Sequence, residues 1–342
     1  MKAAVLTEWE TIEIRDVPIP ELEENECLIK VSYTGICGTD LHIYGGHHPT
    51  AKSPIILGHE FIGTVERIRT NRSVDLKPGD RVVAEPLISC DSCEACREGN
   101  WHVCRTLKLL GIHANGGFAE YLKASVDKVI KVDARLSDRI AALTEPFAVG
   151  FHVNQRAGVK NGDRVLVIGG GPIGHIVGLV AREGGASRVV FSEINPVRID
   201  QVKAFGFETI DPTNEDAASR VHAFTDGEGF DVVIEVSGSQ AGLLFSTEAC
   251  RIRGTVVFVG FLGKIPQFNV LQAIFKELTM VGSRVYTFGH FQKTVKLLEK
   301  MTLENKYDLE KLISDILTLD QLESAIQSMR EGNNLGKILI AL

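Results

Sequence analysis

The sequence predicts a two-domain α/β protein in which a mostly antiparallel β-domain precedes a parallel, doubly wound sheet. The chain has 342 residues, which is long for one hydrophobic core and comfortable for two. Residues 1–148 contain short segments in which apolar and polar residues alternate, as in half-buried strands. Turns rich in proline and glycine separate these segments. In residues 149–284, apolar strands alternate with helical segments, which is typical of a parallel sheet. We expect the tail, residues 285–342, to return to the first domain.

Each domain contains segments with a recognisable pattern. In the first domain, strands are expected over residues 27–33, 61–68 and 80–84, which are rich in β-branched side chains. In the second domain, strands are expected over 164–169, 188–193, 231–236, 255–260 and 281–285, with helices over 172–183 and 195–205. The tail has the pattern of helices over 290–301 and 320–330, followed by a strand over 336–342.

Composition excludes several classes of protein. The net charge is −7 and no run of lysine and arginine occurs, so nothing indicates a nucleic-acid partner. No segment approaches the roughly 18 unbroken apolar residues of a membrane span. The first residues do not suit a signal peptide, because glutamates follow a short apolar run. We therefore expect a cytoplasmic protein, in which cysteines more often serve metal binding or chemistry than disulfides.

Four cysteines at short spacings form the strongest single motif. They follow the pattern Cys90-x2-Cys93-x2-Cys96-x7-Cys104. Four thiolates at such spacings can surround one Zn²⁺ tetrahedrally, and a closed site of this kind is structural rather than catalytic. The alternatives are reduced surface thiols or two disulfides. The spacing and the expected compartment favour a structural zinc.

A second set of residues matches an open zinc site. One soft and three harder ligands are scattered along the first domain: Cys37, His59, Glu60 and Glu145. Three tight ligands would leave a coordination position for water or substrate. Asp40 is expected to accept the second N–H of His59 and so fix its tautomer. Taken singly, Cys37 also fits a small buried residue and His59 a core histidine.

Two further side chains near Cys37 suggest a proton relay. Thr39 offers a hydroxyl and His42 an imidazole, two and five residues after the cysteine. Zinc would lower the pKa of an alcohol, and these groups would carry its proton to solvent. The alternatives are a turn hydroxyl and a surface histidine. His47 and His48 follow closely and could rim the substrate cleft, but the sequence assigns no role to them or to His113.

The segment Val167-Ile-Gly169-Gly-Gly171-Pro172-Ile173-Gly174 fits the pattern G-x-G-x-x-G and predicts a dinucleotide site. It leaves an apolar strand and opens a helix, whose N-terminus would face the phosphates. Glu193 ends the next strand, where a carboxylate binds the ribose 2′-hydroxyl and favours NAD over NADP. Arg198 complicates this preference, because it could pair with Glu193, stack on adenine or help admit a phosphate. A similar fold without a dinucleotide is the alternative.

Together these motifs resemble the zinc-dependent medium-chain dehydrogenase/reductase family, over essentially the whole chain. The matching segments, in order, are Cys37-Gly-Thr-Asp-x-His, Gly58-His-Glu-x2-Gly63, the four-cysteine lobe, Glu145-Pro146 and the glycine fingerprint. The resemblance implies a GroES-like catalytic domain and a Rossmann domain, with the active site in the cleft between them. It also implies hydride transfer from an alcohol carbon to nicotinamide, and a homodimer or homotetramer.

The resemblance also assigns individual positions. A glutamate at Glu145, followed by proline, is similar to the sorbitol, threonine and sugar-acid (L-galactonate-type) branch. Cys37 and His59 are implied as firm zinc ligands, whereas Glu60 and Glu145 exchange with water. Cofactor contacts are implied at Ile173, Glu193, Arg198, Val259 to Phe261, Ser283 and Arg284.

The sequence thus predicts an NAD-dependent zinc dehydrogenase with one catalytic and one structural Zn²⁺ per subunit. Its expected substrate is a small molecule, the secondary alcohol of a sugar acid or polyol. The alternatives are a threonine-type, butanediol-type or simple alcohol dehydrogenase. A relative that binds zinc and nucleotide without catalysis is a further alternative, against which the intact set of candidate catalytic residues argues.

Overall fold

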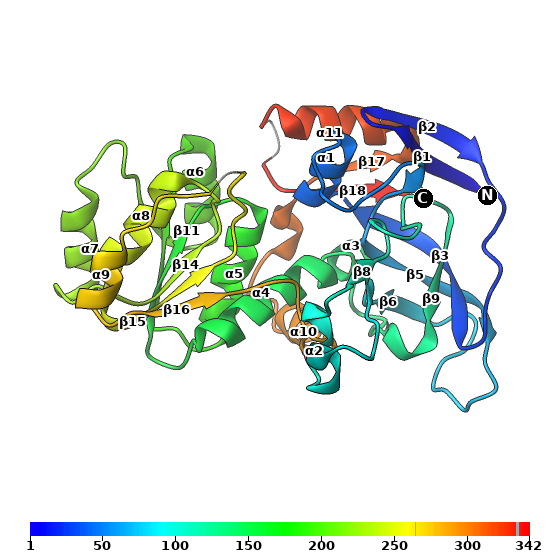
Figure 1. Cartoon of the computed structure of the whole chain (residues 1–342), viewed down its shortest axis with the longest axis horizontal. Coiled ribbons are helices and arrows are strands. Elements are labelled where there is room, and N and C mark those ends of the chain that lie inside the picture. The colour runs from blue at the N-terminus through cyan, green and yellow to red at the C-terminus, as the bar shows by residue number, and fades with distance from the viewer. Residues whose placement is uncertain (264, 333–334) are drawn as a thin grey trace. The chain divides into compact units, whose positions relative to one another are not determined.

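The structure is a computed structural model that describes residues 1–263, 265–332 and 335–342 (Figure 1). The chain divides into two compact units, one made of Met1–Glu145 with Thr287–Leu342 and the other of Pro146–Tyr286. The boundaries expected from the sequence, at residues 148 and 284, lie close to these positions. Among the described helices, none combines the length and the apolar character that crossing a membrane requires.

The first unit is built on a seven-stranded sheet. Its strands follow the order β10-β6-β5-β3-β18-β17, and β9 pairs with the other half of β3. These strands are β3 (Glu26–Gly35), β5 (Glu60–Arg69), β6 (Arg81–Ala84), β9 (Tyr121–Ser125), β10 (Val129–Lys131), β17 (Ile313–Thr318) and β18 (Lys337–Ala341). Apolar side chains of β3, β5, β6 and β9 form one buried cluster, which explains the alternation seen in the sequence.

Smaller elements complete this unit. Two short sheets have the orders β2-β1-β4 and β7-β8. Their strands are β1 (Lys2–Glu8), β2 (Thr11–Asp16), β4 (Ile55–Ile56), β7 (Leu87–Ile88) and β8 (Lys108–Leu109). The helices are α1 (Gly38–Tyr44), α2 (Glu94–Arg97), η1 (Trp101–Val103), η2 (Val126–Lys128), α3 (Asp138–Ala141), α10 (Phe288–Leu303), η3 (Leu309–Leu312), η4 (Leu319–Gln321) and α11 (Leu322–Arg330). Helix α4 (Thr144–Ala157) begins in this unit and continues into the second.

The C-terminal tail contributes two strands to the first unit's sheet, the edge strand β17 and the interior strand β18 beside it. Leu339 to Ala341 pair antiparallel with β3 from Gly35 to Tyr33, and β17 pairs parallel with β18. The strand β17 was not predicted, because its side chains are half-buried or exposed and show no apolar alternation. Strands from the first and the last part of the sequence therefore pair in one sheet.

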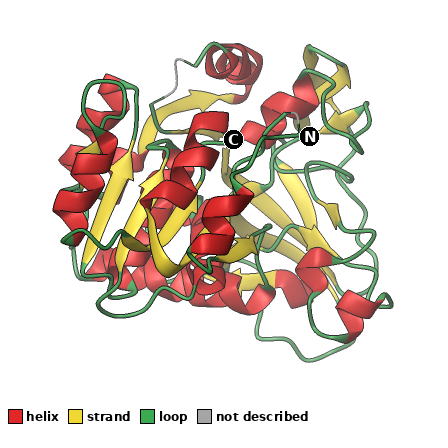
Figure 2. Ribbon diagram, turned by 60° about the vertical axis from the view of Figure 1, so that its left-hand side comes forward, coloured by secondary structure: helices red, strands yellow, loops and turns green. Residues whose placement is uncertain are grey.

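The second unit is a parallel six-stranded sheet in the order β13-β12-β11-β14-β15-β16, the arrangement of a Rossmann fold. Its strands are β11 (Arg164–Ile168), β12 (Arg188–Ser192), β13 (Glu208–Ile210), β14 (Phe230–Glu235), β15 (Cys250–Phe258) and β16 (Thr279–Gly282). Its helices are α5 (Pro172–Glu183), α6 (Pro196–Ala204), α7 (Ala217–Thr225), α8 (Gln240–Ala249) and α9 (Val270–Phe275). Figure 1 shows α5 on one face of the sheet and α8 on the other, and Figure 2 shows both faces covered by helices. The predicted α/β fold class is confirmed.

One strand prediction was wrong in its position. The sequence suggested a strand over residues 281–285, whereas β16 ends at Gly282. Its register against β15 pairs Gly282 with Phe258, the last residue of that strand. Val285 has a φ of 42°, which is incompatible with extended backbone. Ser283 and Arg284 therefore follow the strand instead of lying in it.

Candidate active site

Three predicted zinc ligands meet in the first unit. The ligand atoms of Cys37, His59 and Glu60 all lie within 4.8 Å of one another. Cys37 caps the N-terminus of α1, directly after β3, and Glu60 opens β5. The β3–β5 register pairs Gly35 with Glu60, so antiparallel pairing carries the two segments to the same place. One sulfur, one imidazole and one carboxylate in this arrangement are suitable for Zn²⁺.

Asp40 stands behind His59 but does not form the direct hydrogen bond that we expected. Its Oδ1 lies 3.7 Å from His59 Nδ1, which exceeds hydrogen-bond length. Its Oδ2 instead accepts the backbone N–H of Cys37 at 2.8 Å and so fixes the start of α1. Both facing atoms are buried, and neither has a hydrogen-bond partner in the described part of the chain. A metal on the other ring nitrogen of His59 would suit this arrangement, because a metal-bound histidine usually donates its second N–H to a carboxylate.

The electrostatics of the group also favour a cation. Burial alone lowers the pKa of His59, but the nearby charges of Cys37, Asp40 and Glu145 outweigh it and raise that pKa well above its ordinary value. Burial raises the pKa of Asp40 despite the opposing effect of His59. A buried set of acidic groups around one imidazole is stabilised by added positive charge. The residues present therefore fit a zinc ion.

Glu145 lies outside the three-residue group. It is buried in the first turn of α4, and its charge acts on both His59 and Lys337. Its carboxylate is not among the atoms that cluster within 4.8 Å in the described residues. The structure thus separates two carboxylates that the sequence had presented as equivalent.

Lys337 is the residue of this site that the sequence reading missed. It is only 4% exposed, and its Nζ donates to Ile36 O and to Glu60 Oε1, each at 2.7 Å. Burial lowers the pKa of Lys337, but the charge of Glu60 outweighs this effect and raises it. The available signal was a lysine at the start of the apolar strand β18, where a charge needs a buried partner.

The two proposed relay residues lie on α1. Thr39 and His42 are three positions apart, and such residues share one side of a helix. Thr39 is half-buried, whereas His42 is exposed. Neither side chain forms a hydrogen bond within the described residues. One short helix, capped by Cys37, thus carries a half-buried hydroxyl and an exposed imidazole.

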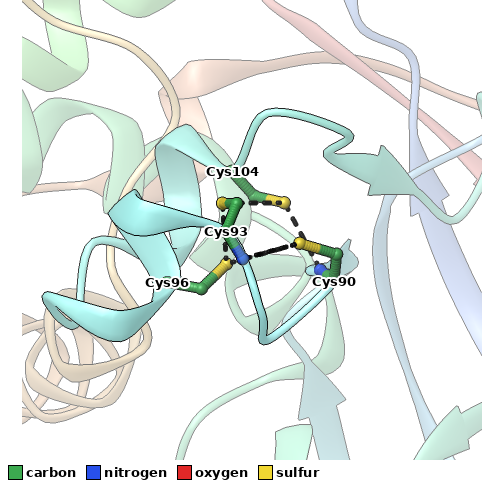
Figure 3. A group of neighbouring side chains, drawn as sticks. All are labelled: Cys90, Cys93, Cys96 and Cys104. Atoms are coloured by element: carbon green, nitrogen blue, oxygen red, sulfur yellow. Dashed lines mark hydrogen bonds between the residues drawn. The ribbon is translucent and has the colours of Figure 1, made fainter.

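The four cysteines of the lobe converge in space, as Figure 3 shows. Cys96 Sγ lies 4.0 Å from Cys90 Sγ and 3.5 Å from Cys93 Sγ, and Cys93 Sγ lies 4.0 Å from Cys104 Sγ. Four sulfurs about 2.3 Å from one Zn²⁺ would be about 3.8 Å apart in a tetrahedron, so the observed spacing suits that ion.

The chemistry of this lobe also suits a metal. Hydrogen bonds from Ser92 and other groups lower the pKa of Cys90 to about 5, and a thiolate is the form that binds metal. All seven cysteines of the chain are free, so the disulfide alternative is not realised in this structure.

The glycine-rich turn stands at the carboxyl end of β11 in the second unit. Gly169 has a φ of 108°, which favours glycine, and Gly171 caps α5 with Pro172 as the first helical residue. A Cβ on Gly174 would lie 2.0 Å from Gly169 O, so only glycine allows this helix to pack so closely. Ile173 is half-buried in the first turn. The turn has the geometry that a pyrophosphate site requires.

Glu193 is held firmly at the end of β12. Its Oε2 accepts the N–H of Gly170 at 2.6 Å, and its Oε1 accepts those of Ile194 and Asn195 at 2.7 and 2.9 Å. The carboxylate thus links the glycine-rich turn to the start of α6. The guanidinium of Arg198, in the first turn of α6, has no partner among the described residues, so it does not pair with Glu193.

The remaining predicted cofactor contacts follow the carboxyl ends of two other strands. Val259 and Phe261 come after β15, and Ser283 and Arg284 come after β16. Phe261 is 90% exposed. Parallel strands end at the same edge of a sheet, so these positions share an edge with the glycine-rich turn.

Comparison with known proteins agrees with this architecture. Residues 23–134 match the alcohol dehydrogenase GroES-like domain family, and residues 172–300 match the zinc-binding dehydrogenase family. The chain is 37% identical to an L-galactonate-5-dehydrogenase of Escherichia coli (strain K12) over 285 residues, 83% of this chain and 82% of the relative. It is 33% identical to a sorbitol dehydrogenase of Halalkalibacterium halodurans over 346 residues, 99% of each chain.

Solved structures are also similar. A zinc-binding dehydrogenase from Sinorhizobium meliloti 1021, bound to NADP, superimposes with a TM-score of 0.89 at 32% identity, covering 100% of this chain and 99% of the other. The sequence motifs, the two folds and these matches agree. The chain belongs to the zinc-dependent medium-chain dehydrogenase family of oxidoreductases.

Proposed function

We propose that this protein is a cytoplasmic dehydrogenase that uses Zn²⁺ and NAD to oxidise a secondary alcohol of a sugar acid or polyol. The observation that carries the proposal is the group of Cys37, His59 and Glu60 within 4.8 Å, on a chain that also has a Rossmann unit with an intact glycine-rich turn. A closed structural site would need a fourth tight ligand, whereas three leave a position for substrate.

The residues of the first unit have distinct roles in this proposal. When bound, Zn²⁺ polarises the alcohol oxygen and makes its proton easier to remove. Cys37, His59 and Glu60 hold the ion, and Asp40 orients His59 from behind. Thr39 Oγ1 accepts the alcohol proton and releases its own hydroxyl proton toward the exposed His42, which passes a proton to solvent.

Lys337 and Glu145 complete the site as charge partners. Lys337 restrains the carboxylate of Glu60 through its buried ion pair. Glu145 is a buried carboxylate whose charge acts on His59 and Lys337, and as a zinc ligand it exchanges with water, as Glu60 does. Both residues set the charge of the site rather than touch the reacting carbon.

The substrate class rests on similarity. A relative at 37% identity is named for L-galactonate, and a relative that matches 99% of this chain is named for sorbitol. Both names describe polyhydroxylated substrates with secondary alcohols. Substrate identity changes readily on one fold, so direct measurement has to decide it.

NAD is the proposed dinucleotide. The carboxylate of Glu193 ends β12, where it binds a ribose hydroxyl and repels a 2′-phosphate. The solved relative from S. meliloti is bound to NADP, so the preference needs its own test. We expect Glu193→Gln to lower kcat/KM for NAD by about tenfold and to affect NADP less. An equal loss for both cofactors would contradict the assignment.

We further propose that two copies associate through β16, the edge strand of the six-stranded sheet. Large apolar side chains are exposed on β16 and the neighbouring α9: Val270, Leu271, Ile274, Phe275 and Met280. An open strand edge beside an apolar patch is suited to pairing with a second copy. Light scattering should show a dimer or tetramer, and Phe275→Glu should shift it toward the monomer.

The decisive experiment measures NAD reduction with a panel of hexonates, hexitols, threonine and butanediol, using the zinc-loaded protein and its Cys37→Ser variant. Turnover of a hexonate or hexitol that is lost in Cys37→Ser would support the proposal. Turnover of threonine or butanediol alone would replace the substrate class. Absence of turnover by protein that binds both zinc and NAD would favour a binding protein without catalysis.

A further inference from the structure

Two histidines of the first unit that have no role in the proposed reaction are linked through hydrogen bonds to one threonine. His48 and His113 lie with ring centroids 6.0 Å apart, and Thr50 connects them. Thr50 Oγ1 lies 2.9 Å from His113 Nε2, and the backbone N–H of Thr50 approaches His48 Nδ1 at 3.4 Å. Residues 48 and 113 come from separate loops, so the pair exists only in the folded chain. We call these three residues the His48–Thr50–His113 group.

Each loop of this group is attached to the candidate active site. The first loop follows α1, and the backbone N–H of His47 donates to the carbonyl of His42 at 2.8 Å. The second loop runs beneath the residue before His59: Gly117 N–H donates to Gly58 O at 2.8 Å. A Cβ on Gly116 would lie 2.2 Å from the same carbonyl, so the contact is tight. One histidine is therefore tied to the relay helix and the other to the ligand segment.

The hydrogen bonds fix where the protons lie in the neutral rings. His48 Nδ1 accepts the N–H of Ala51 at 3.1 Å, so its proton is on Nε2. His113 Nδ1 accepts the N–H of Leu109 at 3.2 Å, so its Nε2–H donates to Thr50 Oγ1. The hydroxyl hydrogen of Thr50 is then directed to another acceptor. His48 Nε2–H has no partner among the described residues, so the group presents two donors.

The loop that carries His48 and Thr50 has no negatively charged side chain. Residues 45–54 contain no aspartate or glutamate, and Lys52 is exposed without an ion pair among the described residues. Burial and the like charges of His113 and His42 lower the pKa of His48. A ligand that accepts hydrogen bonds and carries negative charge would satisfy both donors and offset this repulsion.

We infer that the His48–Thr50–His113 group binds the carboxylate of a hydroxy-acid substrate, through His48 Nε2–H and the Thr50 hydroxyl. This inference rests on the proposed function and makes it more specific, because it selects sugar acids over polyols. The active-site group acts on the alcohol, and the histidine group holds the acid end. His48 and Thr50 are then residues that determine specificity, and His113 positions the Thr50 hydroxyl.

The test compares two substrates that differ only at the acid end, L-galactonate and galactitol. In His48→Asn, the amide oxygen can still accept the N–H of Ala51, but no donor remains at the Nε2 position. In His48→Gln, the amide nitrogen restores a donor near that position. We expect His48→Asn to raise KM for L-galactonate about 10- to 100-fold with little change in kcat, as loss of a charge-assisted hydrogen bond predicts.

The same variant should change kcat/KM for galactitol by less than about twofold, and His48→Gln should recover much of the L-galactonate activity. Thr50→Val should act in the same direction as His48→Asn. His222→Asn, at an exposed histidine of α7 in the second unit, is the matched control and should leave both substrates unaffected. Equal losses on both substrates, or no loss on L-galactonate, would overturn the inference.

Failure of the proposed function would be distinguishable. If the wild type oxidises galactitol but not L-galactonate, the inference is overturned while the dehydrogenase activity stands. If it oxidises neither, the proposed substrate class fails, and calorimetric titration of the zinc-loaded protein with sodium L-galactonate then decides the inference. Binding by the wild type that weakens at least tenfold in His48→Asn would support the carboxylate site. Absent or unchanged binding would overturn it.

Discussion

Lys337 and Glu60, 277 residues apart in the chain, form a buried ion pair with Nζ 2.7 Å from Oε1. Their side chains are 5% and 1% exposed, so water does not screen the pair. The lysine belongs to the C-terminal strand β18 and the glutamate to β5, next to Cys37 and His59. The last strand of the chain thus supplies the charge that holds a candidate zinc ligand.

Replacing Lys337 by methionine should destabilise the first unit by about 3–5 kcal/mol, because the carboxylate of Glu60 would stay buried without its partner. Both tryptophans of the chain, Trp9 and Trp101, lie in this unit, so tryptophan fluorescence during urea unfolding reports on it. Lys311→Met removes an exposed ion pair with Asp308 and should cost at most about 1 kcal/mol. If the two variants lost similar amounts of unfolding free energy, burial of the ion pair would not explain its contribution to stability.

Zinc content should distinguish the two metal sites. We expect two Zn²⁺ per wild-type chain, and one each in Cys37→Ser and Cys93→Ser, because each serine removes a thiolate from a different group. Cys93→Ser should also lower Tm, since a structural zinc site contributes directly to folding. Elemental analysis of the purified proteins measures the content, with Cys250→Ala, in the buried core of the second unit, as a control that keeps both ions. Full zinc content in Cys93→Ser would refute the structural site.

Two glycines of the glycine-rich turn after β11 should respond differently to alanine. A Cβ on Gly171 meets no atom within 4 Å, and its φ of −74° suits any residue, so Gly171→Ala should fold normally. It should nevertheless weaken NAD binding about tenfold or more, because a methyl group would obstruct the pyrophosphate. Gly174→Ala places a Cβ 2.0 Å from Gly169 O and should lower Tm as well. Calorimetric titration with NAD and thermal unfolding separate the two effects, and wild-type affinity in Gly171→Ala would contradict the proposed site.

The stability of the second unit should depend on pH through His175. This side chain is buried on α5 beside Phe191 and Phe205, with Nδ1 3.2 Å from Gly171 O. Burial lowers its pKa, and the nearby hydrogen bonds and Glu193 only partly oppose this effect. As pH falls, His175 therefore takes up a proton near pH 6.5 in the unfolded chain. In the folded chain it takes up a proton only at lower pH. Stability is complete above that pH and is lost as pH falls toward the folded pKa.

We expect His175→Leu to reduce this loss, which amounts to at most about 1.4 kcal/mol per pH unit. Thermal unfolding of the wild type and the variant at pH 7.5 and about 5.5 measures this loss of stability. Acid weakens zinc binding equally in both proteins, so the difference between them reports on His175 alone. His222→Asn, at an exposed site, should keep the wild-type slope. An unchanged slope in His175→Leu would show that the buried imidazole is not responsible.

The sequence by itself determined those features whose residues lie close together in the chain. The strand before Gly169, the glycine-rich turn and α5 form one continuous segment, so their pattern predicts their fold. The four cysteines lie within 15 residues, from Cys90 to Cys104, and their spacing indicates a single cluster. The predicted order of a mostly antiparallel β-domain and a parallel-sheet domain is confirmed, because apolar periodicity and turn residues act locally.

The tertiary structure decided which distant residues meet. Strand pairing brings Lys337 to Glu60, and loop packing brings His48 to His113, although none of these residues has a local pattern that names its partner. The tertiary structure also places Asp40 Oδ1 3.7 Å from His59 Nδ1 and leaves Glu145 outside the cluster of ligand atoms. Such distances follow from sheet register and side-chain packing across the whole unit, which no short segment of sequence encodes.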